Sequence, residues 1–155
     1  MKNKMIDYGK ENTINLKLLI ALVRSGNENY RSTIKLLKQY HLTVPQFGVL
    51  EVLYHLGDMC INDIISKTLS TSGNMTVVIK NLEKAKLINK IQNEKDKRKF
   101  LIRITTKGKK LIEEIFPKHL LDLQKGFSRL EYDEKMILIN SLKKLNGVQT
   151  QNGEN

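Results

Sequence analysis

The spacing of apolar residues along the chain predicts a mainly helical protein. One long helix is expected over residues 13–40, and the polar run 26–29 inside it is a candidate for a kink or a break. A second helix is expected to begin near Thr43, since Pro45 suits a first helical turn, and to end at Gly57. Its apolar stripe consists of Phe47, Leu50, Leu53 and Leu56.

Two shorter helices are expected next, separated by the polar segment 70–74. The apolar positions of the first are Ile61, Ile64 and Ile65, and those of the second are Met75, Val78, Leu82 and Ala85. Short segments with β-branched residues follow at 87–92 and 100–104, with the very polar run 93–99 between them. Two short strands around a charged loop predict a β-hairpin.

Two further helices complete the predicted order. The first begins at the Thr105–Thr106 pair, either of which can cap it, and contains Pro117 as a point of bending. The second is expected over about 133–146. The polar end of the chain, 147–155, lacks periodicity and is expected to be disordered.

The order helix, helix, helix, hairpin is that of a winged helix-turn-helix. We therefore expect a mainly α fold with a small β-hairpin wing (α+β), in which a winged helix-turn-helix domain occupies residues 41–108. An N-terminal helical region, 1–40, and C-terminal helices over 109–146 flank this domain.

Positive charge is concentrated in one part of the sequence. The chain has a formal net charge of +11, and residues 66–110 contain thirteen Lys or Arg but only three acidic residues, so this window carries ten of those charges. Clustered positive charge favours phosphate binding, because the release of counterions supplies sequence-independent affinity for nucleic acid. The alternative is a basic surface that serves only solubility.

The second helix of a helix-turn-helix contacts base edges in the major groove through its N-terminal residues. The candidates here are Ser72, Gly73, Asn74, Thr76, Val77 and Lys80. An Asn side chain can bond an adenine edge in two places, and Thr offers a hydroxyl or a methyl group to a base. Gly73 allows the backbone to approach a phosphate closely. The alternative is that Ser72 and Asn74 only cap the helix, and the two roles are compatible.

The loop of the predicted hairpin contains Asp96, Lys97, Arg98 and Lys99. A thin hairpin with an arginine at its tip can enter a minor groove, where narrow A·T-rich stretches concentrate negative potential. Asp96 can hold the guanidinium of Arg98 by bidentate hydrogen bonds and so fix its direction. The alternative for this loop is a soluble turn.

These two segments together resemble the MarR family of winged helix-turn-helix transcriptional regulators. Residues 96–108 match the wing signature of that family, D-x-R followed by an apolar strand and L-T-x-x-G, with Ile104 in place of the usual Leu. Residues 72–76 and the segment after them resemble its recognition helix, and Lys86 stands where many members have Gly. The resemblance covers about residues 13–146.

The resemblance implies that Arg98 enters the minor groove, that Asp96 orients it, and that the polar tip of the recognition helix faces the major groove. It also implies a homodimer in which residues 1–40 and 109–146 are dimerisation regions. We therefore expect a sequence-specific regulator that binds double-stranded DNA at a pseudo-palindromic operator as a ligand- or oxidant-responsive repressor. A constitutive or architectural DNA-binding protein without an effector switch is the alternative.

Several residues allow a second interpretation. Cys60 is a candidate redox sensor, although a small, half-buried structural residue is the simpler interpretation. The three histidines lack the i, i+3 or i+4 spacing of a helical metal site, so no metal is expected. Aromatic residues could line a pocket for a small-molecule effector of phenolic, quinone or peroxide class, or could belong to the core. They are Tyr40, Phe47, Tyr54 and Phe116.

Other classes of function lack sequence support. There is no P-loop, HExxH motif or supported nucleophile–histidine arrangement, so we expect neither an enzyme nor a cofactor. No apolar run approaches the roughly 18 residues of a membrane span, and the basic start is not followed by the apolar run of a secretion signal. With one cysteine, the chain has no internal disulfide. A cytoplasmic protein without membrane contact is expected.

Overall fold

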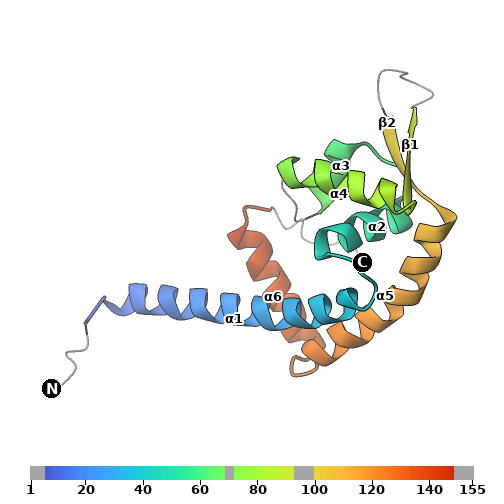
Figure 1. Ribbon diagram of the computed structural model, residues 1–155. Coiled ribbons are helices and arrows are strands. Elements are labelled where there is room, and N and C mark those ends of the chain that lie inside the picture. The colour runs from blue at the N-terminus through green and yellow to red at the C-terminus, as the bar shows by residue number, and fades with distance from the viewer. Residues whose placement is uncertain (1–5, 69–71, 93–99, 149–155) are drawn as a thin grey trace. The chain divides into compact units, whose positions relative to one another are not determined.

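The computed structural model describes residues 6–68, 72–92 and 100–148 (Figure 1). It confirms a mainly helical fold with one small hairpin. The helices are α1 (Lys10–Lys38), α2 (Val44–Leu56), α3 (Ile61–Lys67), α4 (Ser72–Lys84), α5 (Thr106–Gly126) and α6 (Tyr132–Leu145), and the strands are β1 (Ile88–Gln92) and β2 (Phe100–Ile104). The chain divides into two compact units, residues 1–122 and 123–155. No helix in the described ranges has the length and apolar character needed to cross a bilayer.

The first two helices follow the predicted pattern, with differences in α1. Helix α1 begins three residues earlier than expected and continues through residues 26–29, so the candidate break is not observed. Helix α2 begins with a capping box, in which Gln46 N donates to Thr43 Oγ1 at 3.4 Å and Thr43 N donates to Gln46 Oε1 at 2.9 Å. Gly57 ends α2 with a φ of 83°, a conformation that favours glycine.

The core of the first unit is centred on α2. Val49 and Leu50 of α2 are fully buried, and they belong to one cluster with buried residues of α3, α4, β2 and α5. The fully buried members from those elements are Ile64, Met75, Leu82, Ile102, Ile112 and Ile115. This shared core holds the two short helices and the hairpin on one scaffold.

Strands β1 and β2 form an antiparallel hairpin, with Ile88 opposite Ile104 and Gln92 opposite Phe100. A third segment joins it, because Met59 N donates to Ile102 O at 3.3 Å and Ile102 N donates to Met59 O at 2.9 Å. The hairpin is therefore bonded to the loop between α2 and α3. A two-stranded hairpin alone is marginally stable in water, so this attachment matters.

The second unit contains the end of α5 and helix α6. Helix α6 begins at a capping box formed by Glu131 and Glu134, with Glu131 N donating to Glu134 Oε2 at 2.9 Å. None of its residues is buried, and it exposes the consecutive apolar residues Met136, Ile137, Leu138 and Ile139.

Candidate nucleic-acid interface

Helices α3 and α4 form the helix-turn-helix predicted from the sequence. Helix α4 places Met75, Val78 and Leu82 in the core, three or four residues apart and therefore on one face of the helix. This face contacts α2, α3 and β1. The opposite face of α4 is consequently directed away from the scaffold.

The outward face of α4 carries the residues predicted to contact bases. Asn74, Thr76 and Lys80 are exposed, and Val77 is 56% exposed although it is apolar. Ser72 and Gly73 lie in the first turn of α4, so the polar segment predicted to separate the two helices partly belongs to the second. All six predicted positions thus lie on α4, five of them in its first half and Lys80 further along the helix.

The hairpin is the predicted wing, and its base is buried. Ile88, Ile102 and Ile104 face the core, while Lys90 lies over the ring of Phe100 with its Nζ atom 4.4 Å from the ring centroid. The predicted wing residues Asp96, Lys97, Arg98 and Lys99 lie outside the described residues, within 93–99.

One of the basic residues in the wing has an acidic neighbour. Arg103 of β2 donates from Nε to Asp58 Oδ2 at 2.7 Å, and its second nitrogen lies 2.5 Å from the same oxygen. In the sequence, Arg103 belongs to the basic window and to the wing signature, and nothing there points to Asp58. No local signal could have joined residues 45 positions apart.

The turn from α4 into the wing has a strained residue. Lys86 adopts a φ of 59°, in the left-handed region that favours glycine. The left-handed φ of Lys86 explains why many members of the MarR family, which the sequence resembles, have glycine at this position. The turn is held by Thr105, whose hydroxyl donates to Lys86 O at 2.9 Å and accepts from Gly108 N at 3.1 Å as the cap of α5. Lys107 Nζ donates to Ala85 O at 3.0 Å, which satisfies a carbonyl after α4.

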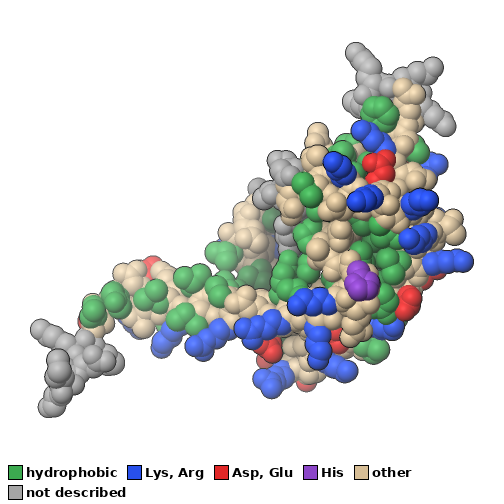
Figure 2. Space-filling view, in the orientation of Figure 1, with side chains coloured by type: hydrophobic (Ala, Val, Ile, Leu, Met, Phe, Trp, Pro, Cys, Tyr) green, Lys and Arg blue, Asp and Glu red, His purple; other side chains and the backbone are tan. Residues whose placement is uncertain are grey.

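Basic side chains gather around α4 and the first turns of α5 (Figure 2). The exposed ones on these segments and on β1 are Lys80, Lys84, Lys86, Lys90, Lys107, Lys109 and Lys110. Glu83 is the acidic residue among them. Such a surface attracts a polyanion before any base-specific contact forms.

Cys60 lies at the start of α3 and is half-buried. Its thiol donates to Asp63 Oδ2 at 2.9 Å. Cys60 is the N-cap residue of α3, but its side chain makes no capping hydrogen bond to the backbone of the helix. Whether the thiol responds to oxidants stays a prediction. The described residues contain no group of three or more His, Cys, Asp or Glu side chains that could hold a metal ion.

The four aromatic residues considered for an effector pocket have different positions. Phe47 lines a cavity of about 280 Å³ beside α2, whereas Phe116 packs against the core. Tyr40 and Tyr54 donate their hydroxyls to neighbouring glutamates of α5, Glu114 at 3.0 Å and Glu113 at 3.4 Å. The other residues that line the cavity are Tyr30, Thr33, Val44, Pro45, Gly48, Glu51, Val52, Lys67, Thr68 and His119.

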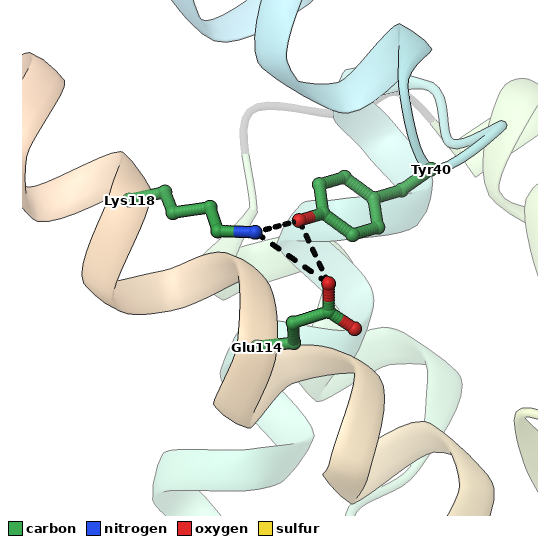
Figure 3. Close-up of polar contacts among 3 residues, drawn as sticks. All are labelled: Tyr40, Glu114 and Lys118. Atoms are coloured by element: carbon green, nitrogen blue, oxygen red, sulfur yellow. Dashed lines mark hydrogen bonds and ion pairs between the residues drawn. The ribbon is translucent and has the colours of Figure 1, made fainter.

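A polar cluster joins α5 to the turn after α1 (Figure 3). Lys118 donates to the Tyr40 hydroxyl and lies 3.5 Å from Glu114 Oε1, so the three groups contact one another. The hydrogen bond that Lys118 donates to the Tyr40 hydroxyl and the adjacent Glu114 carboxylate raise the pKa of Lys118 above its ordinary value, with desolvation opposing the shift. The cluster therefore ties the middle of α5 to the turn between α1 and α2.

The fold and this surface define a winged helix-turn-helix protein. The sequence profile described as transcriptional regulator SarA/Rot matches residues 31–115. The HTH-type transcriptional regulator MhqR of Bacillus subtilis is 34% identical over 139 residues, which cover 88% of this chain and 96% of MhqR. The chain therefore belongs to the SarA/Rot family of HTH-type transcriptional regulators, and is a winged-helix protein of MarR type.

Solved structures agree with this classification. BpsR of Bordetella bronchiseptica superposes with a TM-score of 0.74 at 26% identity, over 81% of this chain and 90% of BpsR. AbsC, a MarR family transcriptional regulator of Streptomyces coelicolor, superposes with a TM-score of 0.77 over 94% of this chain and 97% of AbsC. At 18% identity, the likeness to AbsC shows the fold alone.

Proposed function

We propose that this protein binds double-stranded DNA sequence-specifically as a homodimer, and that a small molecule releases it. The observation that carries the proposal is the face of α4, where Thr76, Val77 and Lys80 are exposed directly behind a buried face. A major groove is wide enough for such a helix. We assign base contacts to Asn74 and Thr76, methyl contact to Val77 and phosphate contact to Lys80.

The wing supplies the second contact in this proposal. The base of the wing is hydrogen-bonded to the α2–α3 loop, so the hairpin is held against the rest of the domain. Arg98 is proposed to enter the minor groove and Asp96 to orient it, with Lys97 and Lys99 near phosphates.

The DNA-binding proposal is tested by selecting bound sequences from random duplexes with the purified protein. Arg98→Ala should weaken binding to the selected site by about 1–3 kcal/mol without unfolding the protein. Arg129→Ala, which removes the same charge from an exposed position of the second unit, is the control and should have little effect. Equal affinity of wild type and Arg98→Ala would reject the wing assignment.

The homodimer is supported by exposed apolar residues on α1. Leu16, Ile20, Val23 and Tyr30 are spaced by four, three and seven residues and are each between 45% and 52% exposed. This is the spacing of a stripe that packs against another helix. Helix α6 likewise exposes apolar residues and buries none. Large unpartnered apolar surfaces of this kind mark interfaces, and we propose that a second copy of the chain covers them.

The oligomeric state is measured by sedimentation. Ile20→Glu should shift the protein toward monomer, because a charge inside an apolar interface is unfavourable. Ser25→Glu, which places the same charge on another side of α1, should leave the dimer intact.

A two-fold dimer should select a pseudo-palindromic site with half-sites about 34 Å apart. If this DNA site overlaps a promoter, the bound dimer represses transcription.

The effector site is proposed to be the cavity beside α2. Its wall is mainly apolar, with Phe47 and Val52, and its polar lining residues include Glu51, Lys67 and His119. The buried Nδ1 atom of His119 has no hydrogen-bond partner among the described residues. An aromatic ring bearing an acid or hydroxyl group fits this combination. The DNA binding of BpsR is regulated by 6-hydroxynicotinic acid. Lys67 is also close in sequence to α4, which gives a ligand a route to the DNA contact.

The effector is tested with 6-hydroxynicotinic acid, phenolic acids and quinones in gel shifts. A compound that releases DNA should lose its effect in Val52→Trp, which fills the cavity. Release by peroxide that disappears in Cys60→Ser would instead assign the switch to the thiol. A protein that ignores every compound and oxidant would support the constitutive alternative.

A further inference from the structure

Asp58 and Arg103 are direct neighbours across a short antiparallel pairing. Met59 and Ile102 exchange two backbone hydrogen bonds, so the residues before and after them, Asp58 and Arg103, lie opposite each other. On the other side of β2, Arg103 is opposite Asn89 of β1. The ion pair therefore spans the junction between the α2–α3 loop and the central strand of the wing.

The geometry of this pair is closer than that of a loose surface contact. Two guanidinium nitrogens of Arg103 lie 2.7 and 2.5 Å from the same carboxylate oxygen, Asp58 Oδ2. The side chain of Asp58 is only 27% exposed, while that of Arg103 is 56% exposed. Partial burial of the carboxylate reduces the screening of the pair by water and salt.

The ion pair lies near the base of the wing, where a small rotation displaces the outer residues of the hairpin. Core packing fixes the base of the hairpin through Ile88, Ile102 and Ile104, and the α2–α3 loop bonds to Ile102, but beyond Ile102 β2 is paired with β1 alone among the described residues. Phe100 lies two residues, about 7 Å, beyond Ile102. A rotation of about 15° of this outer part of the hairpin would thus move Phe100 by about 2 Å. Displacements of this size are large for hydrogen bonds to DNA.

We propose that Asp58 is a positioning residue for DNA binding, which acts through Arg103 to fix the direction of the wing relative to α3 and α4. The inference rests on the proposed function, because it requires that the wing and α4 contact the same duplex. Asp58 itself is acidic and touches no DNA in this proposal. It sets the distance between the contacts made by the recognition helix and those made by the wing.

The sign of the effect separates this role from simple electrostatics. Asp58→Asn makes the protein more positive, and added positive charge by itself strengthens binding to any DNA. We expect instead that Asp58→Asn weakens binding to the selected site about fivefold, within the usual range for groups in direct contact. Binding to random duplex DNA should be unchanged or stronger. Partial unfolding would weaken both, so the ratio of the two affinities distinguishes positioning from loss of structure.

Asp63→Asn is the matched control. It makes the same charge change five residues away on α3, where Asp63 accepts from the Cys60 thiol and makes no hydrogen bond or ion pair to the described residues of the wing. It should bind the selected site at least as well as wild type. Thermal unfolding of both variants shows whether each is folded at the temperature of the binding experiment.

A double-mutant cycle completes the experiment. If the two residues act as one unit, Asp58→Asn together with Arg103→Gln should weaken specific binding no more than the weaker-binding single variant. The inference is overturned if the two substitutions give fully additive losses of specific affinity, or if Asp58→Asn binds the selected site as tightly as Asp63→Asn does. Either result leaves the proposed function standing. If wild type shows no preference for any duplex, the proposed function fails and the inference fails with it.

Discussion

Gly108 lies so close to the backbone of Leu87 that a Cβ atom at position 108 would be 2.3 Å from the Leu87 carbonyl oxygen. The same atom would be 2.7 Å from Cγ1 of Ile104. That carbonyl also accepts hydrogen bonds from Thr105 N and Oγ1, so it cannot move freely. The glycine that ends the wing motif is therefore needed for close approach of α5 to the start of the wing, and not for an unusual φ.

Gly108→Ala should destabilise the protein by about 2–3 kcal/mol, because the new methyl group forces backbone apart in a packed junction. Gly26→Ala is a matched control: a Cβ there meets nothing within 4 Å, and Gly26 is inside α1. That substitution should stabilise the protein by about 0.5–1 kcal/mol. Urea unfolding of both variants measures the difference, and equal effects would contradict the contact with Leu87.

Lys86→Gly should stabilise the fold by about 0.5–1 kcal/mol, because glycine adopts the φ of 59° without the steric penalty that lysine has there. Lys84→Gly removes the same side chain from the last turn of α4 and should destabilise the protein by a similar amount. Opposite shifts of the thermal midpoint are expected. A loss of stability in Lys86→Gly would show that the lysine side chain outweighs the backbone strain.

Asn74→Ala and Thr76→Ala should reduce the preference for the selected DNA site more than they reduce affinity for random duplexes, since base contacts carry sequence information. Each should lower the preference by about 1–3 kcal/mol. Asn81→Ala changes an exposed asparagine further along α4 and should leave the preference intact. Fluorescence anisotropy on both DNAs provides the measurement. Parallel losses on both would count against base recognition by these side chains.

Lys118→Met should lower the thermal midpoint by a constant amount through neutral pH. The pKa of Lys118 is raised above its ordinary 10.5 by the Tyr40 hydroxyl and then by Glu114, so folding favours the charged form. The stabilisation is fully present below the ordinary pKa and is lost as pH rises through the higher value of the folded protein. The difference from wild type should therefore shrink above about pH 10.5. Lys110→Met, also on α5, is the control; a difference that varies around neutral pH would contradict the assignment.

Much of the fold could be predicted from the sequence, because its signals are local. The helix start at Thr43 with Pro45 behind it, the glycine at 57 and the β-branched segments around 93–99 each set the backbone of a few neighbouring residues. Apolar spacing then identified which side of α4 is buried and, by difference, which side is free for DNA. The candidate break at 26–29 is not observed, since a helix tolerates one glycine and short polar residues at a modest energetic penalty.

Only the tertiary structure decided which distant residues meet. Asp58 and Arg103 are paired by a strand contact, Tyr40 contacts Glu114 and Lys118, and only Phe47 of the four aromatic candidates lines the cavity. Periodicity shows which side of a helix is buried, but it does not show which side chain of another element lies against it. That choice depends on the packing of the whole core, so the contacts that support the proposed interface became visible only once the chain was folded.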